Sequence, residues 1–110
     1  MRLRERDKVS MTVHPSAGFD EDVYIWGKGQ PIRAALYPDT RALEARVYGD
    51  QIRETRILLA ERGDAALHVG MGVATAGGAP DYRIQAVDVW GGHQRATLER
   101  IPEGRRGHAL

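Results

Sequence analysis

Short segments in which apolar and polar residues alternate recur along this chain, and most of them end at glycine or proline. The first of these segments is Val9–Val13 and the longest is Tyr82–Trp90. A period of two places successive side chains on opposite faces of a β-strand, whereas an amphipathic helix needs a period near 3.6 residues. The pattern therefore predicts a chain that is mostly β.

Six or seven short strands are expected. The predicted strands are Val9–Val13, Val23–Trp26, Ile32–Tyr37, Arg53–Ala60, Met71–Ala74, Tyr82–Trp90 and Ala96–Ile101. Ser16–Asp22 is predicted to be a turn. Gly91-Gly92 is predicted to be a tight hairpin turn, because both glycines can adopt a positive φ. Short antiparallel strands joined in this way predict a small barrel or sandwich.

Alternation also assigns faces to two of the predicted strands. In the longest strand it groups Tyr82, Ile84, Ala86 and Trp90, and this is the predicted core face. In the strand that ends at Ala60 it groups Thr55, Ile57 and Leu59.

The segment Pro38–Ile52 does not follow the strand pattern. Arg41–Arg46 consists of good helix formers, with Asp39 or Thr40 as a candidate N-cap and Gly49 as a candidate C-terminal stop. An isolated helix shorter than about 12–15 residues is marginal in water. The segment is therefore predicted to be a long excursion between two strands, helical only where something supports it.

Together these features predict an all-β, mostly antiparallel fold: a six- to seven-stranded β-barrel with one long inter-strand excursion at residues 38–52. A length of 110 residues fits a single domain. Residues 1–102 are predicted to form this domain, and residues 103–110 a flexible C-terminal tail. Aromatic residues make up only 6% of the chain, so the core is expected to be modest and burial against a partner would stabilise it.

Composition disfavours several classes of protein. The chain has no cysteine, which excludes disulfides and thiolate metal sites. A net charge of +1 gives no overall electrostatic preference for nucleic acid. The apolar stretches fall well short of the ~20 residues of a transmembrane helix, and no apolar segment follows the basic residues 1–6 as in a signal peptide.

No catalytic, cofactor or metal site is predicted, and the chain is not expected to be an enzyme. Its four histidines lack metal-ligand spacing, and neither Ser10 nor Ser16 lies in a nucleophile elbow. Gly70-Met71-Gly72 lacks the third glycine of a dinucleotide loop, since Thr75 stands there. Asp20, Glu21 and Asp22 suit a solvated turn better than a cation site. Asp39 and Glu44 suit capping and helix-surface roles better than an acid–base pair.

The order of features along the chain resembles the phage head–tail joining family, also called head-completion or stopper proteins. A basic opening and a strand come first, followed by an acidic turn and a strand that ends in tryptophan. Next come a strand closed by proline, a variable excursion and a middle strand. The order ends with a Gly-Met-x-Val step, a strand that begins with tyrosine, and a closing hairpin. The corresponding residues are 1–6 and Lys8–Val13, Phe19–Asp22 and Trp26, Ile32–Pro38, Glu54–Leu59, Gly70–Val73, Tyr82–Val87 and Arg95–Ile101.

This resemblance implies a six-stranded barrel that assembles as a dodecameric ring in the neck of the virion. The ring would lie below the portal and its adaptor, help retain packaged double-stranded DNA, and join the head to the tail or tail-terminator proteins. The excursion would face the lumen or a partner. Its candidate residues are Arg41, Leu43, Glu44, Arg46 and Tyr48.

The sequence is also compatible with two other functions. The chain differs from the family at Arg33, where an aromatic residue is frequent, and at Ala60-Glu61-Arg62, where an Arg-Tyr pair is frequent. These differences leave a tail terminator or another neck or tail ring protein as an alternative. A monomeric nucleic-acid-binding barrel is the third hypothesis, and its stacking residues would come from Trp26, Tyr37, Tyr48, Tyr82 and Trp90.

Overall fold

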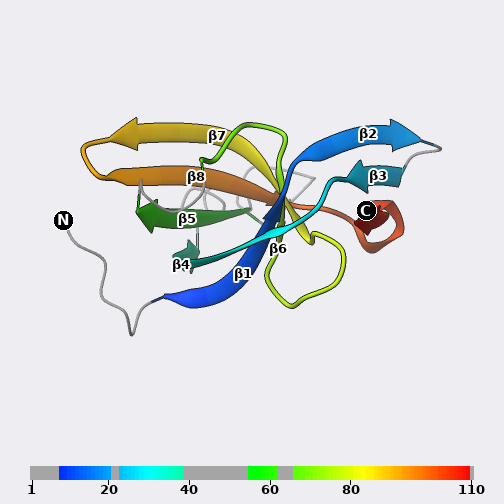
Figure 1. Cartoon of the computed structure of the whole chain (residues 1–110), viewed down its shortest axis with the longest axis horizontal. Coiled ribbons are helices and arrows are strands. Elements are labelled where there is room, and N and C mark those ends of the chain that lie inside the picture. Colours follow the sequence, from blue (N-terminus) through cyan, green and yellow to red (C-terminus); the bar gives the residue numbers. More distant parts are fainter. Residues whose placement is uncertain (1–7, 21–22, 39–54, 62–65, 110) are drawn as a thin grey trace, which may run out of the picture.

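The structure is a computed structural model, and it describes residues 8–20, 23–38, 55–61 and 66–109 (Figure 1). The strands are β1 (Val9–His14), β2 (Ser16–Asp20), β3 (Val23–Trp26), β4 (Gln30–Pro38), β5 (Thr55–Glu61), β6 (Gly72–Ala74), β7 (Tyr82–Trp90), β8 (His93–Arg100) and β9 (His108–Ala109). A 3₁₀ turn, η2, covers Glu103–Arg105. The described residues contain no α-helix. The predicted excursion lies almost entirely in residues 39–54, outside the described part of the chain.

Six strands close into a barrel in the order β1-β4-β5-β8-β7-β6. Every neighbouring pair in the barrel is antiparallel, including the closing pair of β1 with β6. The predicted all-β barrel is therefore confirmed. Closure pairs both edges of each barrel strand, which removes the open edges that make isolated sheets prone to aggregate.

Small and branched apolar side chains fill the barrel. The core cluster consists of Met11, Val13, Ile32, Ala34, Leu58, Ala60, Leu67, Val73, Tyr82, Ile84, Ala96 and Leu98. Leu58, Ile84 and Leu98 have no exposed surface. Tyr82 is the aromatic member of this cluster, as its position in the alternation predicted. On β5, Leu58 and Ala60 face the core. The predicted group Thr55, Ile57 and Leu59 therefore lies on the outer face of this strand.

A β-bulge in β7 overturns part of the predicted core face. The register with β8 shifts between Ile84 and Ala86, so Gln85 is an extra residue in the strand. An inserted residue inverts the alternation that follows it. Val87 consequently packs against the core cluster, while Ala86 is exposed. The prediction of Ala86 as a core residue is wrong for this reason, and the side chain of Trp90 is outside the described part of the structure.

The predicted hairpin between β7 and β8 is present at Gly91-Gly92. Gly91 has φ of 51°, and Gly92 does not have a positive φ. The backbone therefore requires the conformational freedom of glycine at the first turn position only.

A second sheet projects from one end of the barrel, with strand order β2-β3-β9 (Figure 1). β1 continues into β2, and β3 continues into β4, so that one long ribbon bends at Pro15 and Gly27–Gly29. We call the β2-β3-β9 sheet the arm. The prediction of a turn over Ser16–Asp22 is wrong for Ser16–Asp20, because these residues pair with β3 as a strand.

The C-terminal segment differs from the predicted flexible tail of residues 103–110. After η2 the chain turns back, and β9 pairs with β3 in parallel orientation. Gly107 has φ of 65° at this turn, and a Cβ there would overlap the carbonyl oxygen of Tyr24. Glycine therefore allows the close approach of the two backbones that docks the segment on the arm.

Candidate interaction surface

A row of aromatic rings runs along the arm from a buried root to an exposed end. The Tyr24 and Trp26 rings stack with centroids 5.2 Å apart, and the Phe19 and Tyr24 centroids are 4.8 Å apart. Trp26 has no exposed surface, Tyr24 is half-buried and Phe19 is 54% exposed. The outer end of the row therefore offers a large apolar side chain to a partner.

The root of this row is fixed by packing and by a hydrogen bond. Trp26 Nε1 donates to the backbone oxygen of Arg106 at 2.8 Å, which ties the C-terminal segment to the arm. A Cβ added at Gly72 would lie 2.9 Å from Trp26 Cε3 and 2.7 Å from Pro80 Cβ, so no free space remains between β6 and the indole ring. Arg83 of β7 extends over the Tyr24 ring, with Cζ 5.8 Å from its centroid, and adds a cation–π contact to the barrel.

His14 supports the bend between barrel and arm. It is buried, and its Nδ1 donates to the Gly27 carbonyl oxygen at 2.9 Å, since that oxygen can only accept. The Gly27 backbone N donates in turn to the Pro15 oxygen at 2.7 Å. The ring also packs against Gly29, where a side chain would overlap it. His14 thus acts in the structure as a spacer at the bend, and its buried Nε2 has no hydrogen-bond partner among the described residues.

One edge of the arm is open in the described part of the structure. β2 pairs with β3 on one side, and no described strand lies on its other side. Ser16, Ala17, Gly18 and Phe19 are all exposed. An exposed edge presents unpaired backbone donors and acceptors, which makes it a template for another strand.

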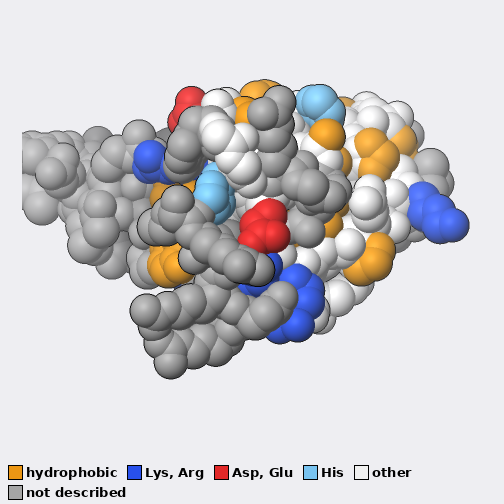
Figure 2. Space-filling model, turned by 60° about the vertical axis from the view of Figure 1, so that its left-hand side comes forward, with side chains coloured by type: hydrophobic (Ala, Val, Ile, Leu, Met, Phe, Trp, Pro, Cys, Tyr) orange, Lys and Arg blue, Asp and Glu red, His pale blue; other side chains and the backbone are white. Residues whose placement is uncertain are grey.

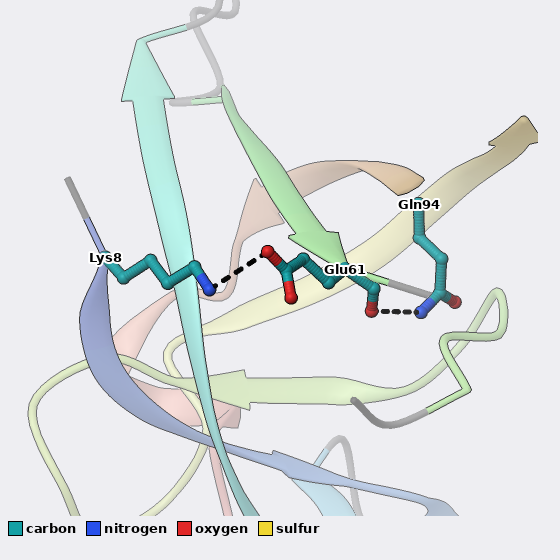
Figure 3. A network of polar contacts seen from close by, with 3 residues as sticks. All are labelled: Lys8, Glu61 and Gln94. Atoms are coloured by element: carbon teal, nitrogen blue, oxygen red, sulfur yellow. Dashed lines mark hydrogen bonds and ion pairs between the residues drawn. The ribbon is translucent and has the colours of Figure 1, made fainter. Parts of the chain in front are cut away.

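The opposite end of the molecule carries a polar network (Figure 3). Lys8 Nζ lies 3.3 Å from Glu61 Oε1, and Gln94 Nε2 donates to the Glu61 backbone oxygen at 3.4 Å. Gln94 Oε1 accepts a hydrogen bond from the Leu67 backbone N at 2.9 Å. The network joins the start of β1 to the end of β5 and to the chain that leads to β6.

A shallow groove of about 460 Å³ adjoins this network. It is lined by Lys8, Ser10, Gln30, Pro31, Ile32, Arg33 and Glu61. Two cationic side chains and one carboxylate line it, and the carboxylate is paired with Lys8. On the face that Figure 2 shows, acidic and basic side chains lie side by side and hydrophobic ones form separate small patches.

The ion pair predicts an asymmetric response to substitution. The Lys8 side chain is 8% exposed and that of Glu61 39%. Glu61→Gln removes a carboxylate beside a nearly buried ammonium, so we expect a loss of about 1–2 kcal/mol in the free energy of unfolding, below the 3–5 kcal/mol of fully buried pairs. Lys8→Met removes the buried charge itself and is expected to change stability by less than about 0.5 kcal/mol. Urea denaturation of both variants tests this, and equal losses would contradict it.

Few of the predicted site residues fall within the described part of the chain. The candidate lumen- or partner-facing residues Arg41, Leu43, Glu44, Arg46 and Tyr48 all lie outside it. Of the aromatic residues proposed for base stacking, Trp26 and Tyr82 are buried in the structure and Tyr37 is 41% exposed. The described side chains of this predicted set therefore share no exposed face.

Sequence reasoning predicted β3 but missed its partner β2 in the arm, because Ser16–Asp20 does not alternate between apolar and polar residues. The signal that could have revealed it is Phe19, which pairs with Tyr24 and is separated from it in the sequence by three acidic residues and a valine. Aromatic cross-strand pairs stabilise hairpins.

Among the described residues, no group of three or more His, Cys, Asp or Glu side chains is placed to hold a metal ion. None of the described segments is a helix long and apolar enough to cross a membrane. Comparison of the chain with protein-family models, curated proteins and solved structures found no match.

Proposed function

We propose that this chain is a structural subunit of the neck of a tailed phage. It forms a ring below the portal and its adaptor, helps retain packaged DNA and joins the head to the tail. The observation that carries the proposal is the closed six-stranded antiparallel barrel, which is the fold that the resemblance to head–tail joining proteins implies.

The distribution of surfaces supports assembly into a ring. A ring requires contacts between unlike surfaces, repeated until they close. The arm and the start of β1 lie toward opposite ends of the long axis (Figure 1). The arm carries an exposed Phe19 and an edge that no described strand pairs with, while the other end carries paired charges. These two ends are different enough to meet head to tail.

The length of residues 39–54 supports a role for this segment beyond connection. β4 and β5 are antiparallel neighbours, and Pro38 is paired with Arg56. A hairpin turn of two to five residues usually joins such ends. The chain instead uses a much longer segment, and we propose that its residues Arg41, Leu43, Glu44, Arg46 and Tyr48 face the channel or an adjoining ring.

Replacing residues 39–54 with a short glycine-containing turn tests the proposed function. The paired ends of β4 and β5 should allow the barrel to fold with an unchanged far-ultraviolet circular dichroism spectrum. We expect heads assembled with this variant to lose packaged DNA or to fail to attach tails, measured as DNA-filled heads and infectious particles. A control keeps the length and changes only the five proposed residues to serine.

The outcomes separate the related neck functions. Leaking heads would support the stopper function, whereas full heads with tails of abnormal length would identify a tail terminator. Fully infectious particles would show that the segment has no stopper function. Tight, steeply salt-dependent binding of single-stranded nucleic acid by the isolated monomer would instead favour a nucleic-acid-binding barrel.

A further inference from the structure

We propose that the open edge of β2 binds residues 2–6 of a neighbouring copy as an added strand. This inference rests on the proposed ring function and specifies the contact between its subunits. Strand addition to an exposed edge is a common mode of recognition, in which the backbone supplies hydrogen bonds and alternate side chains supply specificity.

Natural edge strands are protected by proline, by lysine, by a β-bulge or by a covering segment. The bulge of β2 lies between Ser16 and Gly18, so Phe19 and Asp20 follow it in regular register with β3, and no described segment covers them. β2 contains neither proline nor lysine, and four of its five residues are exposed. Its exposed Phe19 contacts Tyr24, so a strand added here would extend an apolar surface that already has a buried root.

Residues 2–6 match this edge in both polarity and charge. Arg2, Arg4 and Arg6 alternate with Leu3 and Glu5, so an extended conformation places the arginines on one face and Leu3 on the other. β2 ends with Phe19 followed by Asp20, and two further acidic residues come next in the sequence.

The alternation selects one register for each strand direction. Placing Leu3 opposite Phe19 brings Arg2 or Arg4 opposite Asp20, for antiparallel or parallel addition respectively. The apolar residues then share one face, and the arginine and aspartate positions share the other. Arginine can pair with a carboxylate through two hydrogen bonds, which would fix the register of the contact.

Residues 2–6 of the same copy cannot make this contact. β1 spans Val9–His14 between this segment and the arm, and both of its edges are occupied, by β4 and β6. Leu3 is five positions before Lys8 and can lie at most about 17–18 Å from it. The six residues of β1 alone extend about 20 Å from Lys8 toward the arm, so Leu3 of the same copy falls short of β2. The strand must therefore come from a second copy, and a contact between opposite ends of the molecule repeats head to tail.

The absence of cysteine from the chain gives a direct test. Two full-length variants, Leu3→Cys and Phe19→Cys, are mixed and oxidised mildly. Cross-strand neighbours lie about 4.5–5.5 Å apart, within the Cα separation that a disulfide requires. We expect covalent dimers of one chain of each kind, on the order of tenfold more than in a control mixture of Leu3→Cys with Val69→Cys, because contact raises the effective concentration of the thiols. Val69 is 62% exposed and lies outside the arm, so its thiol is accessible.

A chain that carries both Leu3→Cys and Phe19→Cys should give a ladder of covalent oligomers, since each copy then has both halves of the contact. Equal yields from the two mixtures would overturn the inference. If the unsubstituted chain forms rings by light scattering and the yields are equal, only the proposed contact fails. If the contact forms but the chain has no place in a phage particle, the neck function fails and the contact stands. A chain that stays monomeric overturns both.

Discussion

Trp26→Ala is expected to lower the free energy of unfolding by about 3–5 kcal/mol and to detach the arm from the barrel. The Trp26 side chain has no exposed surface and fills the space between Gly72, Pro80 and Tyr24. Removing the indole ring leaves a cavity that the surrounding side chains cannot fill. The substitution also removes the hydrogen bond to the Arg106 carbonyl. Urea denaturation gives the stability change, and hydrogen exchange of the arm amides reports whether the arm opens.

Two control substitutions separate packing from hydrogen bonding at this position. Trp26→Phe keeps most of the apolar surface and loses the N–H donor, so we expect a loss of about 1–2 kcal/mol. Phe19→Ala removes an aromatic ring at the exposed end of the same row, and we expect a loss below about 1 kcal/mol. If Phe19→Ala were as costly as Trp26→Ala, the arm would not be anchored by its root as the structure indicates.

Val87→Asp is expected to destabilise the barrel by about 2–4 kcal/mol, whereas Ala86→Asp is expected to change stability by less than about 0.5 kcal/mol. The reason is the bulge at Gln85, which turns Val87 toward the core and leaves Ala86 exposed. An aspartate at position 87 would place a charge against apolar neighbours without a partner. The pair of variants is matched, because both introduce the same side chain into adjacent positions of one strand.

Thermal or urea unfolding of the two variants measures this difference directly. Simple alternation from Tyr82 predicts the reverse order, with Ala86→Asp as the costly substitution. A larger loss for Ala86→Asp would therefore show that β7 runs without the bulge.

The proposed functions link these stability changes to assembly. Detachment of the arm would move Phe19 and the β2 edge relative to the barrel, so Trp26→Ala should also weaken association of the chain with itself. Val87→Asp acts inside the barrel and should affect association only through the fraction of folded protein. Light scattering under conditions where both variants remain folded distinguishes these two effects.

The sequence alone determined the all-β class, most of the barrel strands and the hairpin at Gly91. These depend on local properties: alternation along Val9–Val13 and Tyr82–Trp90, and the freedom of glycine to adopt a positive φ. For these features the local pattern and the final fold agree.

Tertiary structure alone decided the bulge, the arm and the docked C-terminal segment. Alternation cannot reveal the extra residue at Gln85, because only the register with β8 makes it extra. β2 has no periodic pattern and exists as a strand because β3 pairs with it. The polar C-terminal segment is held because a buried indole N–H needs an acceptor and because Gly107 lets the backbone approach Tyr24. Each of these features depends on contacts between residues far apart in the chain or on backbone pairing, which the properties of a single short segment do not contain.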